Sequence, residues 1–363
     1  MNIKSLLLGS AAALVAATGA NAADAIIAPE PEAVEYVRVC DAYGAGFFYI
    51  PGTETCLRVS GMVRYQIDWT SEDDGWKKYG RAELNFDARN ETELGTLRSF
   101  IKLRATSHSG HIGDTAVSIS GTDFNKLKGK AYGNNGNVGL QEAFIGLGGL
   151  EMGLRDTLYD AGLSGEFDSG GGSRVHFMSY TFAGGNGFSA TLALEEADYD
   201  YDYKPNVVGK LGFTQGWGSV DAWVAYDATA KEWAVKGIAK ANVTDAVWLE
   251  AIATYESGHN FYGVITAKDF GFGSVSANLG AKWSLGGLVG YKFNDKLKAS
   301  IGAQYFDKIA HVSGLKGVSA GATVDYEVVK GFNTKLAVNY LSAKYQGQKE
   351  DGWAGFVRFQ RNF

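Results

Sequence analysis

Apolar and polar side chains alternate along much of the chain. Between Leu57 and Trp69, the odd-numbered positions carry Leu, Val, Gly, Val, Tyr, Ile and Trp, whereas the even-numbered positions carry Arg, Ser, Met, Arg, Gln and Asp. Successive side chains of a β-strand point to opposite faces, so this stretch predicts a strand with one apolar and one polar face. The same alternation recurs over residues 80–89 and 97–104.

The stretch from Trp353 to Phe363 repeats this pattern, and the chain stops on an aromatic residue. About ten alternating residues are enough for a tilted strand to cross a bilayer. A closed antiparallel barrel suits such a strand, because closure pairs every backbone group where lipid offers no partner. Bacterial outer-membrane barrels commonly end on such a strand, and we expect Phe363 to be the signal read by the barrel assembly machinery. A final strand of a soluble β-sandwich is the alternative.

Strand patterns continue through the chain and number sixteen. The fourth and fifth meet at the turn Gly148–Gly149, and eleven more follow. These lie near Arg174–Phe182, Phe188–Glu196, Val207–Gln215, Ser219–Ala228, Trp233–Val243, Ala246–Tyr255, Trp283–Phe293, Leu297–Phe306, Val318–Val328, Asn333–Tyr345 and Trp353–Phe363. Short turns such as Lys330–Gly331 alternate with longer loops such as Asp156–Ser173 and Gln346–Gly352, as in outer-membrane barrels, whose short turns are periplasmic. We therefore predict an all-β fold, a 16-stranded antiparallel transmembrane β-barrel that encloses an aqueous channel.

The N-terminus has the features of a secretory signal. A positive start with Lys4 precedes an apolar run from Leu6 to Ala17 and an A-x-A cleavage site at Ala20–Ala22. We expect residues 1–22 to be a signal peptide, residues 23–56 a lead-in, and residues 57–363 the barrel. Export implies an oxidising compartment.

The lead-in holds both cysteines of the chain, Cys40 and Cys56. In an exported protein, two cysteines most simply form one disulfide. A metal site would need further ligands, and a catalytic thiol would need an activating base. The sequence offers neither nearby, so we predict a structural disulfide.

Composition narrows the choice of function. The chain has 49 Gly, 20 Phe, 19 Tyr and 8 Trp but only 4 Pro, which suits many strands joined by tight turns. The formal charge of −6 argues against nucleic acid as a partner, because phosphate binding requires a basic surface. Aromatic residues should gather in girdles at the two membrane interfaces. The candidates are Trp69, Trp217, Trp223, Tyr255, Trp283, Tyr291, Tyr326, Tyr340 and Trp353.

Several segments together match one known pattern: Met1–Ile26, the cysteine-bracketed segment Glu35–Val59, Glu93–Thr96, Ser179–Ser189 and the ending Val357–Phe363. They resemble the major outer-membrane porins of Brucella and related rhizobial bacteria. The resemblance implies a homotrimeric, water-filled, general-diffusion porin for small hydrophilic solutes and ions, placed in the outer membrane among lipids that include lipopolysaccharide. Arg361 departs from the wider porin pattern, which has an aromatic residue there.

The resemblance also implies that the third long loop folds into the barrel and narrows it. The matching residues are about Leu158–Gly172. We expect its acidic side chains to face basic side chains on the wall and to create a transverse field that selects ions. The acidic candidates are Asp156, Asp160, Glu166 and Asp168, and the basic candidates are Arg64, Arg81, Arg89, Lys102, Arg104 and Arg155. Ordinary lumen-facing polar residues are the alternative.

Rival functions have less support. A barrel enzyme would need a Ser/His or Asp/His constellation, but four of the five histidines fall in predicted loops without a G-x-S-x-G element. The sequence shows no motif for a cofactor or metal, although the acidic run Asp198–Tyr203 could hold a divalent cation if it is not simply a solvated loop. A substrate-specific channel and a barrel closed by its own loops, such as Glu256–Lys282, remain open alternatives.

Overall fold

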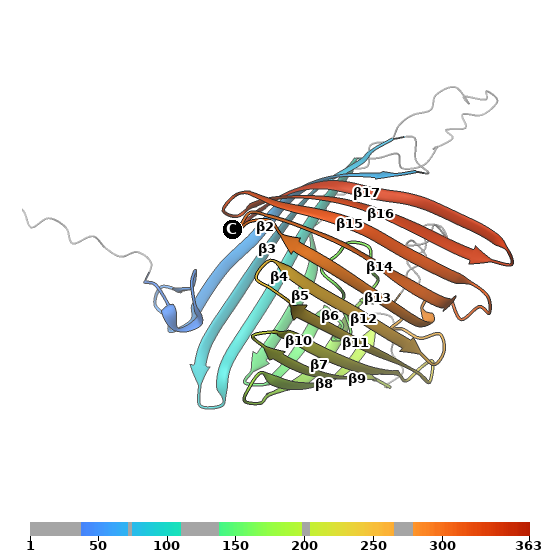
Figure 1. Ribbon diagram of the computed structural model, residues 1–363. Coiled ribbons are helices and arrows are strands. Elements are labelled where there is room, and N and C mark those ends of the chain that lie inside the picture. The colour runs from blue at the N-terminus through green and yellow to red at the C-terminus, as the bar shows by residue number, and fades with distance from the viewer. Residues whose placement is uncertain (1–37, 72–74, 110–137, 198–203, 265–278) are drawn as a thin grey trace, which may run out of the picture. The chain divides into compact units, whose positions relative to one another are not determined.

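The structure is a computed structural model that describes residues 38–71, 75–109, 138–197, 204–264 and 279–363. The residues from Val39 onward form one compact unit, a closed β-barrel (Figure 1). The predicted signal peptide, most of the long segment 107–137 and the acidic run 198–203 lie outside the described residues. Among the described residues, no helix is long and apolar enough to cross a membrane.

Sixteen antiparallel strands form the wall, each paired with its neighbours in chain order, and the last strand pairs with the first to close the ring. They are β2 (Cys56–Thr70), β3 (Lys77–Thr92), β4 (Gly95–Ser109), β5 (Val138–Leu147), β6 (Leu150–Asp156), β7 (Arg174–Ala183), β8 (Phe188–Ala197), β9 (Asn206–Gln215), β10 (Gly218–Asp227), β11 (Glu232–Asn242), β12 (Val247–Glu256), β13 (Ala281–Lys292), β14 (Leu297–Ile309), β15 (Lys316–Val329), β16 (Phe332–Tyr345) and β17 (Gln348–Asn362). The predicted strand number and closure are confirmed.

The connections alternate in length, with one exception to the predicted pattern. Tight turns such as Gly148–Gly149 join strands at one rim, and most longer loops lie at the other. The prediction of a long loop at Gln346–Gly352 is wrong, because β16 and β17 stay paired up to Tyr345 and Gln348. Gln346 and Gly347 alone make that turn, both with positive φ (50° and 84°). The polar residues of this stretch predict a loop, but they belong to the ends of the two strands, which extend beyond the apolar zone.

The two faces of the strands separate as the alternation predicts. Large apolar side chains cover the outside, for example Leu211, Leu285 and Ile301, with 55%, 59% and 61% of their surface exposed. On a membrane barrel these positions contact lipid. The placement of Trp223 in an outer aromatic girdle is wrong: it is 3% exposed and packs inside the barrel.

A short hairpin precedes the barrel wall. Strand β1 (Phe48–Tyr49), which the sequence pattern did not predict, pairs with the start of β2, and the 3-10 helix η1 (Asp41–Tyr43) lies before it. The predicted disulfide is present, with 5.9 Å between the Cα atoms of Cys40 and Cys56. It closes the base of this hairpin.

Candidate functional site

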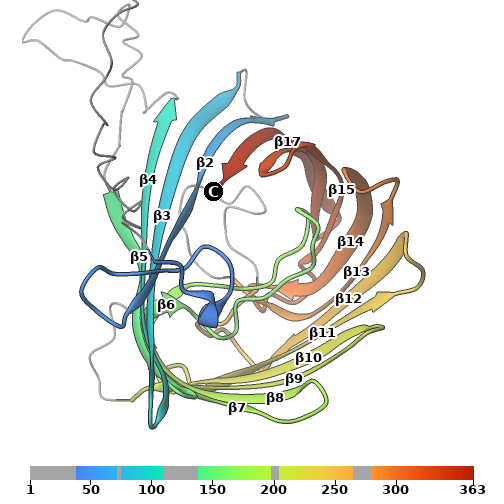
Figure 2. The same ribbon diagram turned by 90° about the vertical axis from the view of Figure 1, so that its left-hand side faces the viewer.

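The connection between β6 and β7 enters the barrel, as Figure 2 shows for the green segment that follows β6. Glu195 on β8 fixes its start, because its carboxylate accepts hydrogen bonds from Thr157 Oγ1 (2.5 Å) and from the backbone N–H of Leu158 (2.7 Å). The indole of Trp223 donates to the carbonyl of Leu158 at 2.9 Å. We call residues 157–173 the constriction loop.

The strongest anchor of the constriction loop is Lys236 on β11. Its ammonium donates to the carbonyls of Tyr159, Ala161 (2.9 Å) and Gly170 (2.5 Å), and its side chain is completely buried. The same ammonium lies 4.2 Å from the centre of the Tyr159 ring. A buried charge is tolerated when each of its protons has an acceptor, and here three converging carbonyls supply them.

Further wall residues hold the rest of the loop, mostly through its backbone. Glu250 on β12 accepts from the N–H of Ser164 at 2.8 Å, and Gln304 on β14 accepts from the N–H of Ser169 at 2.9 Å. On the next two strands, Ser319 donates to the carbonyl of Phe167, and Asn339 donates to that of Glu166 at 2.6 Å. The loop is therefore attached along the wall from β8 to β16.

An apolar seat lies beneath the loop. Leu163 and Phe167 pack with Ile238, Ile252 and Leu288 in the main buried cluster of the protein, which sits inside the barrel between loop and wall. Gly302 on β14 makes room for Phe167, because a β-carbon at this position would collide with its ring. Burying these side chains in the water-filled lumen stabilises the docked loop.

A second connection also folds inward. The segment after β12 places Tyr262 (2% exposed) against Tyr159 of the constriction loop, with 5.4 Å between the ring centres. The hydroxyl of Tyr262 donates to Glu195 at 3.1 Å. The segment is part of Glu256–Lys282, the loop considered above as one that closes the barrel. The sequence pattern did not single out Tyr262, because the segment follows no strand periodicity.

Glu166 is the loop carboxylate that reaches basic side chains of the wall. It accepts from Lys335 on β16 at 3.0 Å and from Arg358 on β17 at 3.1 Å. Neither partner was among the basic residues predicted from sequence. Both fall on the polar face of their strands, so the alternation alone contained the signal.

Of the predicted basic residues, Arg64, Arg81 and Arg104 are brought together on the adjacent strands β2, β3 and β4. Arg64 and Arg81 are directly opposite in the strand register. Their side chains donate to neutral oxygens, Arg64 to Gln360 at 2.8 Å and Arg81 to Thr106 at 3.3 Å. Arg104 instead pairs with Glu83 at 2.8 Å.

The remaining basic candidates meet carboxylates elsewhere. Lys102 pairs with Glu142, and Arg155 pairs with Glu151 at 2.7 Å. Arg89 joins Arg58 and Arg98 around Asp87, which is 1% exposed. Arg58 and Arg89 also lie under the Phe47 ring of the N-terminal hairpin, so Arg89 belongs to a cluster beside the disulfide.

The other acidic candidates do not share one surface. Asp168 accepts from the backbone N–H of Leu163 at 2.7 Å and so braces the loop internally. Partial burial raises the pKa of Asp168 from 3.8 to about 6. Asp160 is exposed beside Gly172, and Asp156 is exposed at the end of β6, opposite Arg174.

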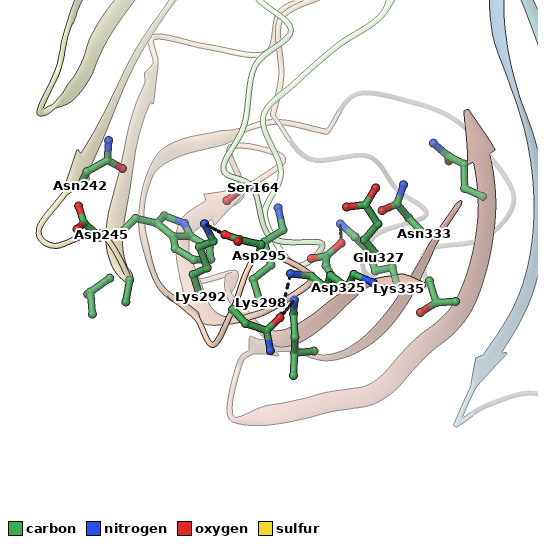
Figure 3. Close-up of a pocket in the computed structure, with 18 of the residues that line it drawn as sticks. Ser164, Asn242, Asp245, Lys292, Asp295, Lys298, Asp325, Glu327, Asn333 and Lys335 are labelled. Atoms are coloured by element: carbon green, nitrogen blue, oxygen red, sulfur yellow. Dashed lines mark hydrogen bonds and ion pairs between the residues drawn. The ribbon is translucent and has the colours of Figure 1, made fainter. Parts of the chain in front are cut away.

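A polar hollow of about 730 Å³ lies beside the loop, between Ser164 and the strand ends near the β11–β12 and β13–β14 turns (Figure 3). Six basic and four acidic side chains line it. They are Arg64, Lys292, Lys296, Lys298, Lys335 and Arg358 against Asp245, Asp295, Asp325 and Glu327. The lining of this hollow therefore holds more basic than acidic side chains, although the chain as a whole is acidic.

A family model described as "Porin subfamily" matches residues 24–361. The chain belongs to the porin family. Porin Omp2b of Brucella abortus (strain 2308) is 43% identical over 398 aligned residues that cover 100% of both chains. Porin Omp2b of Brucella canis is 42% identical with the same coverage. The resemblance noted from the sequence is therefore confirmed.

Solved structures share the fold of this porin at low identity. The outer-membrane channel DcaP of Acinetobacter baumannii has a TM-score of 0.61 and 16% identity, over 87% of this chain and 99% of its own. An anion-selective porin from Comamonas acidovorans has a TM-score of 0.55 and 11% identity, over 85% and 100%. The trimer form of OmpT from Vibrio cholerae has a TM-score of 0.57 and 10% identity, over 86% and 100%.

Family and fold together establish what this porin does. It is a general diffusion channel of the Gram-negative outer membrane rather than an enzyme. Among the described residues there is also no group of three or more His, Cys, Asp or Glu side chains arranged to hold a metal ion.

Proposed function

We propose that the constriction loop and the basic wall opposite it form the selectivity site of this porin and that the site favours anions. Small hydrophilic solutes and ions would pass between the loop and β2–β4. Among the described residues, the loop contacts the wall from β8 to β17, and none of these contacts involves Arg64, Arg81 or Arg104 on β2–β4.

The balance of charge across this gap supports an anion preference. Glu166, the loop carboxylate that contacts basic wall residues, is already neutralised by Lys335 and Arg358. In contrast, within the described part of the chain Arg64 and Arg81 form no ion pair. Two cations in a narrow pore whose charge no ion pair among the described residues cancels lower the energy of a passing anion and raise that of a cation. This pair is the observation that carries the proposal.

The reversal potential of the purified porin in a potassium chloride gradient tests it. We expect chloride to be more permeant than potassium, and Arg64→Gln with Arg81→Gln to lower that ratio about twofold or more. Lys316→Gln is the matched control, because Lys316 pairs with Asp307 at the far end of β14 and β15. An unchanged ratio in the double variant would remove these arginines from the selectivity site.

A conductance series distinguishes a general pore from a substrate-specific channel. Conductance of a general pore rises in proportion to bulk salt, whereas a channel with a strong binding site saturates. We expect proportional behaviour for potassium chloride, because the charged groups of the site face water-filled space rather than a closed pocket.

We also propose a homotrimer in contact with lipopolysaccharide, exported by the signal peptide of residues 1–22 and inserted by the barrel assembly machinery through Phe363. The trimer form of the Vibrio neighbour supports the assembly state. The Phe363 ring is 56% exposed while its backbone pairs with Gly61, so the ring is accessible to another protein. Light scattering of the purified protein should give three chains per particle, and Phe363→Ala should lower the amount inserted in the membrane.

A further inference from the structure

A row of mostly basic side chains runs along the lumen wall beside the constriction loop. In the strand register, Lys292 on β13 is opposite Lys298 on β14, which is opposite Asp325 on β15. Asp325 is opposite Lys335 on β16, which is opposite Arg358 on β17. Five adjacent strands thus place four cations and one carboxylate in one row of directly opposite positions, and Figure 3 shows Lys292, Lys298, Asp325 and Lys335 following one another across the hollow.

Such a row is unfavourable without counter-charge. Like charges directly opposite on neighbouring strands destabilise a sheet, and the row contains two such pairs, Lys292 with Lys298 and Lys335 with Arg358. Glu166 and Asp325 neutralise the second pair, with Lys335 lying 3.0 Å and 3.4 Å from their carboxylates. The constriction loop therefore already places an anionic group on one half of the row.

The first pair has far less compensation. Lys292 meets Asp295, but that carboxylate is 96% exposed on the β13–β14 turn, where an ion pair contributes little. Within the described residues, the ammonium of Lys298 has no ion pair, although it faces the hollow with Lys296 nearby. This half of the row is open to an anion from solution.

We propose that the row Lys292–Lys298–Asp325–Lys335–Arg358 is a binding site for solutes that carry several negative charges, such as short polyphosphates, phosphorylated sugars and polycarboxylates. Adjacent strands are about 4.8 Å apart. Lys292 and Lys298 in one half of the row, and Lys335 and Arg358 in the other, therefore lie at the spacing of charged groups along such a solute. A monovalent anion contacts one cation at a time, whereas a multivalent anion bridges two. The hollow of about 730 Å³ is large enough for a molecule of this size.

The site also places Glu166 in competition with the solute. Because Glu166 already binds Lys335 and Arg358, a long polyanion reaches these two cations only by displacing its carboxylate. Removing that carboxylate should therefore strengthen binding, whereas removing a cation from the open half should weaken it. A general increase in positive charge would not produce these opposite effects at separate positions.

The proposal is tested by adding tripolyphosphate to purified full-length porin in a planar bilayer. The measurement is the block of the single-channel current. We expect brief blocking events that become rarer at high salt, and about a two- to fivefold weaker affinity in Lys298→Gln. Lys292→Gln combined with Lys298→Gln should lose most of the block, Glu166→Gln should strengthen it, and Lys316→Gln, the control, should match the unaltered protein.

Two results would overturn the binding site. One is equal block in the double lysine variant and the unaltered protein; the other is orthophosphate acting as strongly as tripolyphosphate. The outcome is separate from that of the ion-selectivity proposal, because the chloride-to-potassium ratio is measured without polyanion and is tested at Arg64 and Arg81, which are not members of the row. A variant that fails to insert is identified by the absence of conductance steps. Lys298→Arg, which keeps the positive charge at this position, then replaces that variant as the test of the site.

Discussion

Replacing Lys236 with methionine should loosen the constriction loop while leaving the barrel intact. The ammonium donates to three loop carbonyls, and a hydrogen bond from a charged donor contributes about 1.5–3 kcal/mol. Methionine also relieves the cost of burying the charge, which is several kcal/mol, so the net loss is about 3 kcal/mol. Since 1.4 kcal/mol is about tenfold in an equilibrium constant, the undocked loop should become about a hundredfold more populated.

Two measurements follow the loop directly. Single-channel recordings should show a higher mean conductance and more open-channel noise in Lys236→Met, because the loop then moves within the pore. Hydrogen exchange should accelerate at the loop amides, for example Ser164 and Ser169, and not in the paired strands. Thermal unfolding of the barrel should change little, because β11 keeps its backbone pairing with β10 and β12.

A control separates the anchor from lysine loss in general. Lys316→Met removes an ammonium that is 55% exposed and 3.8 Å from Asp307, far from the loop anchors. It should behave as the unaltered protein does. If Lys236→Met gave the same noise and the same loop exchange as this control, the three carbonyl contacts would not be what holds the loop.

Three further predictions concern the apolar contact of Phe167 beneath the loop, the disulfide and the dependence of stability on pH. Gly302→Val should displace the Phe167 ring and raise conductance in single-channel recordings, whereas Gly209→Val, on β9 where an added β-carbon meets no other atom within 4 Å, should not. Replacing Cys40 and Cys56 with alanine should lower the stability of the hairpin by about 3 kcal/mol. Hydrogen exchange of the hairpin amides should then be faster, and adding a reductant should not change it further. The raised pKa of Asp168 means that its contribution to stability is largest below about pH 4 and declines as pH rises through about 6. The difference in melting temperature between Asp168→Asn and the unaltered protein across this range checks the sign; a flat difference would contradict it.

The barrel was predictable because its rule is local. Whether Val63 faces lipid and Arg64 faces water depends on the alternation of apolar and polar side chains within one strand, and the sequence contains this alternation directly. Closure into sixteen strands follows from counting such segments. The β1 hairpin was missed because Phe48 and Tyr49 make too short a strand to show any period.

The site depends on relations that no single strand contains. Lys335 and Arg358 lie on polar faces like many other residues, and their importance comes from the register that puts them opposite each other and beside Glu166. Lys236 shows a second limit. A lysine on a lumen-facing position reads as an exposed cation, yet the loop folds over it and buries it completely. Only the docked loop supplies the carbonyls that make this burial favourable.

The way the loop is held has an evolutionary consequence. Lys236, Gln304 and Asn339 all bind main-chain groups of the loop, and every residue type except proline, which lacks the N–H, provides those groups. Mutations at exposed loop positions such as Asp160 can therefore change the chemistry presented to passing solutes while the loop keeps its path. A lineage under new nutrient or antibiotic pressure can therefore change its permeability by single substitutions at these positions, while the docked loop that narrows the pore is kept.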